Sequence, residues 1–213
     1  MTGPTAAPAG VMRTWRESPR PVRALVVGLF VNRLGGFLLV FLVLFLTDRG
    51  LSATRAGVAL GVHGAGSIMG VLVGGALADR FGARRAVVGS TVASAVLVVA
   101  LLHVRPYPAV LAVAFAVGAA GQVYRPAAAA VLSRLTPPER QVMIFATYRL
   151  ALNLGTTAAP LIGAALVTAS YALLFYAEAA AMLGYAAIVA VALPRDPPAG
   201  TGADAGARGP GRG

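Results

Sequence analysis

The feature that most constrains this chain is its series of long apolar segments. Each approaches or exceeds the roughly 20 residues that cross a bilayer at about 1.5 Å rise per residue. We predict six membrane spans, at 24–47, 56–77, 86–103, 109–132, 142–169 and 171–193. None alternates apolar and polar residues as a transmembrane β-strand would, so the sequence predicts an all-α membrane protein.

Composition separates this chain from soluble enzymes and nucleic-acid-binding proteins. The mean hydropathy is +0.78 and only 12% of the residues are charged. A net charge of +11 would suit nucleic acid if the basic residues clustered on a soluble face, but here they punctuate apolar segments. The chain has no cysteine and no phosphate-binding loop. We therefore expect no enzyme activity, no cofactor, no metal site and no nucleic-acid partner.

The arginines predict how the chain is oriented. Basic residues are retained on the cytoplasmic side during insertion. One side of the predicted topology carries only Arg49, Arg55 and Arg105. The opposite side carries Arg13, Arg16, Arg20, Arg23, Arg80, Arg84, Arg85, Arg134, Arg140, Arg195, Arg208 and Arg212. We expect a multi-pass protein of the cell membrane with both termini in the cytoplasm.

The two ends of the chain differ from its centre. Residues 1–21 and 195–213 are rich in Pro, Gly and Ala, with scattered charge. Such segments bury too little apolar surface to offset the entropy lost on ordering. We predict two disordered cytoplasmic tails that flank a transmembrane domain at residues 22–194.

A charged stretch, GALADRFGARR at 75–85, separates the second and third spans. On arginine count alone it is an ordinary cytoplasmic loop. Asp79 adds nothing to topology, but beside the arginines it can form a charge network that depends on helix positions. Glycine permits a tight turn or a close helix approach. The candidate residues of a conformational switch here are Gly75, Asp79, Arg80, Gly82, Arg84 and Arg85.

This stretch resembles the loop signature of the major facilitator superfamily, Gly-x-x-x-Asp-[Arg/Lys]-x-Gly-x-[Arg/Lys]-[Arg/Lys], which lies between the second and third helices. A second stretch, GTTAAPLIGA in the fifth span, resembles a motif of that family's proton-coupled antiporters. It matches at Gly155, Pro160 and Gly163, whereas Ala159 and Ala164 stand where glycines are usual. The arginine expected inside the fourth span comes later than in the family pattern.

The resemblance implies half of a major facilitator fold: six helices built as two inverted three-helix repeats. Complete members have twelve helices, whose halves enclose a solute site at mid-membrane and expose it alternately. The implied function is secondary transport of a small solute, with proton-coupled efflux. The implied partners are the lipid bilayer and a second six-helix half, from another copy or a separate chain. A truncated, non-transporting half and a six-helix sensor or scaffold are the alternatives.

Charged side chains inside the spans are functional candidates because each costs a few kcal/mol unless it faces a cavity or a partner. The alternative for the arginines is snorkelling to the interface. In the fifth span, Arg149, Asn153, Thr156 and Pro160 share one helical face. The excess of arginine over acid favours an anionic solute. The candidates for a substrate or proton pathway are Asn32, Arg33, Arg125, Arg149, Asn153 and Glu178.

Three features of the spans have two interpretations each. Glu178 is either a proton carrier or a structural counter-ion for an intramembrane arginine. His63 is expected to be hydrogen-bonded structure rather than a titrating group. The glycines of the second span, at Gly66, Gly70 and Gly74, form a small-residue face that predicts close helix packing within the bundle.

Overall fold

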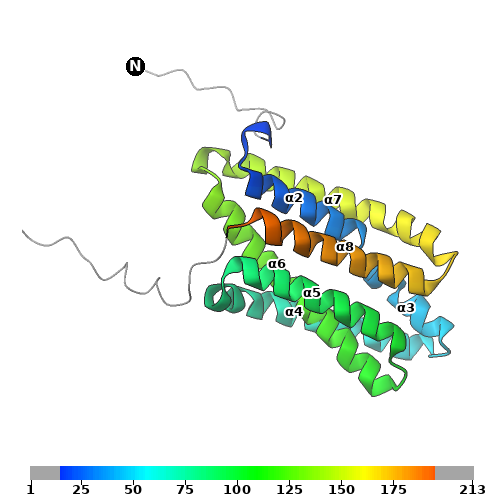
Figure 1. The fold of residues 1–213 in the computed structure, drawn as a ribbon. Coiled ribbons are helices and arrows are strands. Elements are labelled where there is room, and N and C mark those ends of the chain that lie inside the picture. The colour runs from blue at the N-terminus through cyan, green and yellow to red at the C-terminus, as the bar shows by residue number, and fades with distance from the viewer. Residues whose placement is uncertain (1–14, 195–213) are drawn as a thin grey trace, which may run out of the picture.

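The computed structural model describes residues 15–194, and these form a bundle of antiparallel helices (Figure 1). Six helical segments are long and apolar enough to cross a membrane, as the sequence predicts. The first of them, Arg20–Asp48, consists of two helices. The helices are α2 (Arg20–Leu34), α3 (Leu38–Asp48), α4 (Ala53–Phe81), α5 (Ala83–His103), α6 (Tyr107–Leu135), α7 (Pro138–Val167) and α8 (Tyr171–Ala192).

Short connections with helix-starting residues make each span reverse its direction. The hydroxyls of Ser52 and Ser170 accept hydrogen bonds from the backbone N–H groups of Arg55 and Leu173, at 3.3 and 3.1 Å. Such caps satisfy the N–H groups that a helix start leaves unpaired. Prolines stand in the first turns of α2, α6 and α7, where the missing N–H costs nothing.

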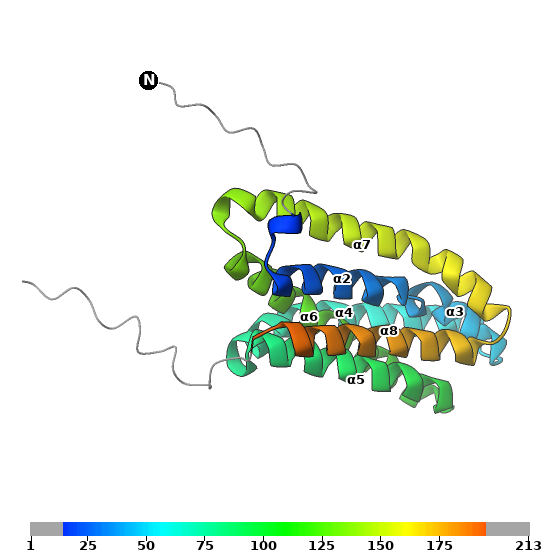
Figure 2. The ribbon, with the colours of Figure 1, turned by 45° about the horizontal axis from the view of Figure 1, so that its top comes forward.

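The packing of the first three spans is repeated, inverted, by the last three. The first span packs through α2 against α7 and α8, and the fourth span, α6, packs in the same way against α4 and α5. The third and sixth spans, α5 and α8, also pack against each other (Figure 2). Because α2 and α6 run in opposite directions, the two sets are related as inverted repeats. This arrangement confirms the predicted half of a major facilitator fold.

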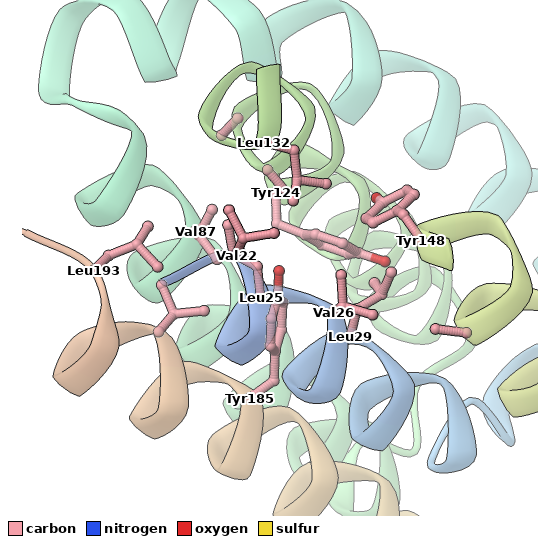
Figure 3. Close-up of a cluster of buried hydrophobic side chains, with 14 of the residues drawn as sticks. Val22, Leu25, Val26, Leu29, Val87, Tyr124, Leu132, Tyr148, Tyr185 and Leu193 are labelled. Carbon is pink, nitrogen blue, oxygen red and sulfur yellow. The ribbon is translucent and has the colours of Figure 1, made fainter. Parts of the chain in front are cut away.

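Two clusters of buried apolar side chains hold the bundle together. The cluster toward the start of α2 joins Leu25 and Leu29 to Tyr124, Tyr148 and Tyr185 (Figure 3). The rings of Tyr124 and Tyr185 meet edge to face, with centroids 5.5 Å apart. The cluster toward the opposite end consists mainly of leucines and phenylalanines from α3, α5 and α8.

The glycines of α4 bring it into close contact with α6, as their spacing predicts. A Cβ atom on Gly66 or Gly70 would overlap the backbone carbonyls of Phe115 or Ala119 on α6. Gly118 of α6 lies in the same way against the backbone of α4. Small residues permit such backbone approach inside a membrane, where van der Waals packing drives association.

Ordered structure begins before the boundary at residue 21 that composition suggests. Residues 15–17 form a helical turn, and Trp15 packs against the cluster of Figure 3. Glu17 forms an ion pair with Arg140, at 2.8 Å, which ties this turn to the start of α7. The rest of the predicted tails, residues 1–14 and 195–213, lies outside the described residues.

Candidate functional site

The first span breaks between α2 and α3, where a continuous helix at 24–47 was expected. Gly35 and Gly36 stand at the break. Gly35 lies so close to α8 that a Cβ atom there would overlap the side chain of Ala181. The N–H of Leu38, at the start of α3, donates a 2.7 Å hydrogen bond to Oε2 of Glu178. The carboxylate thus provides an acceptor for a buried N–H that loses its partner because the helix is interrupted inside the membrane.

Glu178 therefore has a partner that the sequence did not indicate. Its side chain is 4% exposed, and α8 carries it to the start of α3. Within residues 15–194, no ion pair joins it to Arg33, Arg125 or Arg149. The counter-ion interpretation is wrong for this conformation. Its hydrogen-bond acceptor role at the break leaves the proton-carrier interpretation open to experiment.

A polar cavity of about 210 Å³ lies where α2, α4, α6 and α7 meet. Leu39, Val40 and Met182 add apolar surface from α3 and α8. α4 and α7 stand on opposite sides, with α2 and α6 between them (Figure 1). The polar side chains of the lining belong to Asn32, Arg33, His63, Gln122, Tyr124 and Thr156. We call this space the central cavity.

Arg33 is held against the cavity wall by one hydrogen bond and one close packing contact. Its Nη2 donates to the hydroxyl of Tyr124 at 2.6 Å, and its guanidinium lies 5.9 Å from the ring centroid. Gly155 of α7 lies against the Cβ of Arg33, and any larger residue at position 155 would displace Arg33. The Nε of Arg33 is buried and has no hydrogen-bond partner among the described residues. Arg33 is thus positioned with donor capacity to spare.

Two more lining residues have buried polar atoms without a partner. These are Oδ1 of Asn32 and Nδ1 of His63. The expectation that His63 is hydrogen-bonded structure is wrong for its ring, since only its backbone carbonyl accepts a bond, from Ser67. Unpaired buried polar atoms are rare because each costs about 1–3 kcal/mol. Their concentration at one cavity is typical of a ligand site.

The structure divides the predicted pathway residues into two groups. Asn32 and Arg33 line the central cavity, whereas Arg125, Arg149 and Asn153 are exposed and do not belong to its lining. Arg125 donates to Oε1 of Gln122 at 3.3 Å. The polar face predicted on the fifth span is therefore split, because only its Thr156 and Pro160 reach the cavity.

The stretch at 75–85 is a helix end and a one-residue turn rather than a loop. Asp79 and Arg80 belong to the last turn of α4, and Gly82, at φ +90°, is followed at once by α5. That φ favours glycine. Within residues 15–194, Asp79 is exposed and forms no ion pair or hydrogen bond with the arginines. The charge network expected around Asp79 is not formed in this conformation.

The other residues of this stretch have separate surroundings. Arg84 donates from Nε and Nη2 to the carbonyl of Ala190, at 3.2 and 2.5 Å, and so ties α5 to α8. Arg85 lines an apolar groove between α4, α5 and α6. A Cβ atom added to Gly75 would have no neighbour in the described chain. The close helix approach expected at Gly75 therefore involves no helix of this bundle.

Through its antiporter-like residues, α7 contacts the helices that precede and follow the break. Gly155 lies against Arg33 at the end of α2, and Gly163 lies against Phe37 and Phe41 at the start of α3. Pro160, between them, lines the central cavity. This spacing therefore lets α7 contact both helices of the first span.

Three polar lining residues, Tyr124, His63 and Gln122, are not among the predicted pathway candidates. Each is uncharged or weakly basic, so the cost of a charge inside the membrane, which marks the arginines and Glu178, does not mark them. Tyr124 directly precedes Arg125, and one position along a helix turns a side chain by about 100°. The rotation of α6 therefore decided which of the two neighbours reaches the cavity.

Comparison with known proteins places the fold and the site in context. The family model described as Major Facilitator Superfamily matches residues 25–210. An uncharacterized MFS-type transporter of Mycobacterium tuberculosis is 31% identical over 176 residues, which cover 80% of this chain and 41% of that protein. The uncharacterized MFS-type transporter YttB of Bacillus subtilis is 27% identical over 173 residues, covering 80% and 43%.

Solved structures have the same helix arrangement. A mutant of the peptide transporter POT in complex with alafosfalin superposes with a TM-score of 0.67 at 22% identity, covering 81% of this chain and 38% of that one. POT in complex with sulfate gives 0.67 at 20% identity, covering 85% and 41%. The chain spans about two fifths of the length of the relatives it matches. Its relatives are transporters rather than enzymes, and the chain belongs to the major facilitator superfamily.

Proposed function

We propose that this chain is the solute-binding half of a secondary active transporter that works by proton-coupled efflux with alternating access. The observation that carries the proposal is the central cavity, which is lined by helices of both inverted repeats and holds three unpaired polar atoms of α2 and α4. A site between repeats changes its access when one repeat moves against the other. Efflux rather than uptake is proposed from the antiporter-like spacing of Gly155, Pro160 and Gly163.

Proton coupling is proposed to act through Glu178. Its carboxylate accepts the N–H of Leu38 at the break between α2 and α3. Protonation removes the negative charge and weakens that charge-assisted hydrogen bond. Since Arg33 and Leu39 lie on either side of the break and both line the cavity, a change at the break alters the cavity. The proton and the solute would thus be coupled through one structural element.

A second six-helix half is proposed to cover the exposed faces of α4 and α7. Large apolar side chains project from α4 at Ile68 and Leu72, which are 67% and 71% exposed. Leu161 of α7 is 74% exposed. Asp79, Arg149 and Asn153 are exposed on the same two helices, and we propose that they contact this partner. The partner is either a second copy of the chain or a separate chain.

The orientation is proposed from the arginines. The start of α2, the α4–α5 turn, the α6–α7 connection and the end of α8 lie at one end of the bundle (Figure 1). That end carries most of the arginines of residues 15–194, so we propose that it faces the cytoplasm, with the protein in the cell membrane.

Proton-coupled efflux is testable in inside-out membrane vesicles that contain the chain, alone or as a linked tandem copy. A respiratory proton gradient is followed with a quenched pH-sensitive dye, and small carboxylates, amines and neutral amides are added singly. We expect at least one solute to restore fluorescence. Glu178→Gln should abolish this response, whereas Glu139→Gln, at an exposed acid outside the bundle core, should preserve it. If no solute restores fluorescence with either the single chain or the tandem copy, the chain is a non-transporting half.

A further inference from the structure

We propose that the central cavity binds a small organic oxyanion with a hydrogen-bond donor next to the charge and an apolar body behind it. The inference rests on the proposed function, because it names the solute class of the same cavity. Three observations carry it: an arginine without a counter-charge among the described lining residues, an unpaired acceptor on the neighbouring residue, and an apolar remainder of the lining.

No acid of residues 15–194 forms an ion pair with Arg33. Of the described residues that line the cavity, none is acidic. Glu178, the acid at the break, accepts the backbone N–H of Leu38 and does not line the cavity. Tyr124 accepts only one of the guanidinium hydrogens, and Nε is left without a partner. A guanidinium in this state is suited to a planar oxyanion, which accepts parallel hydrogen bonds.

A neutral or cationic solute fits these surroundings poorly. It would leave the positive charge of Arg33 uncompensated in a half-buried site inside the membrane. His63 of α4 also lines the cavity and adds a second nitrogen without a partner at Nδ1. Neither the guanidinium of Arg33 nor the imidazole of His63 can supply a negative charge to pair with a cation. The charge of the cavity therefore selects against cations.

The unpaired oxygen of Asn32 specifies a second group on the solute. Asn32 precedes Arg33 on α2, and both line the cavity. Its Oδ1 is a hydrogen-bond acceptor that is buried without a donor. A solute with a hydroxyl or N–H close to its oxyanion would match this acceptor while its charge pairs with Arg33. A 2-hydroxy or 2-amino carboxylate has this pattern.

The remaining wall is apolar and the space is small. Leu39, Val40, Val117, Pro160 and Met182 line it from four helices. A volume of about 210 Å³ lies below the range of about 300–1,000 Å³ that is usual for drug-sized ligands. The cavity therefore suits a solute with one ring or a short branched chain rather than a multi-ring drug.

Four probes of one shape test this inference by equilibrium binding to the purified chain in lipid nanodiscs. Mandelate carries the oxyanion, the hydroxyl and a phenyl ring, and phenylacetate lacks the hydroxyl. Mandelamide lacks the charge, and 2-amino-1-phenylethanol replaces it with a positive one. We expect mandelate to bind about 10- to 100-fold more tightly than mandelamide and about 2- to 10-fold more tightly than phenylacetate. The cation should bind most weakly.

Two variants assign these preferences to residues. Arg33→Gln should remove the preference for mandelate over mandelamide, and Asn32→Leu, of nearly the same shape, should remove the preference for mandelate over phenylacetate. Arg105→Gln, at an exposed arginine outside the cavity, should leave both ratios unchanged. Each ratio compares two probes on the same protein, so a change in the amount of folded protein does not affect it.

The outcomes distinguish this inference from the proposed function. Anion-selective binding without any transport would uphold the solute class and remove the transport proposal. Transport of amines, with no preference for mandelate over the cation, would retain transport and overturn the solute class. Absence of saturable binding by both anions to the unaltered chain would also overturn it.

Discussion

Arg33 and Glu178 show two ways in which this chain accommodates a charge inside the membrane. Glu178 is buried, and its carboxylate accepts a backbone N–H at a helix break. Arg33 is only half-buried and has a single phenol as its hydrogen-bond partner. A charged group that is fully satisfied stabilises the fold, whereas one with unpaired donors is available to a ligand. The two residues therefore differ in the hydrogen-bonding capacity that the bundle leaves unused, which is larger for Arg33.

The role of Glu178 predicts a graded loss of stability. Glu178→Ala leaves the N–H of Leu38 buried without an acceptor, which should lower the free energy of unfolding by about 1–3 kcal/mol. Glu178→Gln keeps an acceptor oxygen and should cost less. Denaturant unfolding in detergent measures both. Glu139→Ala, at an exposed acid, should stay within about 0.5 kcal/mol of the unaltered protein. Equal losses for the Ala and Gln variants would show that the hydrogen bond contributes little.

At the scale of elements, the helices contact one another through faces of different character. α4 places Gly66 and Gly70 against the backbone of α6. Its other side carries Gly75 next to open space, along with exposed apolar residues. One helix thus has a face that packs within the bundle and a face that is free in the described chain.

This difference predicts opposite effects of one substitution at two glycines of α4. Gly70→Val drives a side chain into the carbonyl of Ala119 and should destabilise the bundle by about 1–3 kcal/mol or more. Gly75→Val meets nothing within the chain and should leave stability nearly unchanged or slightly raised, since it removes a helix glycine. Thermal unfolding in detergent compares the two. Similar losses at both positions would contradict the assignment of faces.

The sequence predicts elements better than it predicts the site, for identifiable reasons. Span lengths follow from apolar runs, and the glycine spacing of α4 follows from helical periodicity. The break at Gly35 was missed because its stabilising partner, Glu178, is far away in the chain. Arg33 was found by its charge, but Tyr124 was not, because helix rotation is set by tertiary packing.

At the scale of the whole molecule, the central cavity lies between the two inverted repeats. The first repeat lines it from α2, α3 and α4, and the second lines it from α6, α7 and α8. In the proposed mechanism, motion of one repeat against the other changes which end of the cavity is open.

The most direct test of this account uses a single cysteine in the naturally cysteine-free chain. Thr156→Cys places a thiol at the central cavity, and membrane-impermeant thiol reagents are applied from each side of sealed vesicles. Controls are Ser133→Cys, near the arginine-rich end of α6, and Arg105→Cys, at the opposite end. We predict that each control reacts from one side only, whereas Cys at 156 reacts from both, in proportions that a proton gradient shifts. Reaction of that cysteine from a single side under all conditions would contradict alternating access.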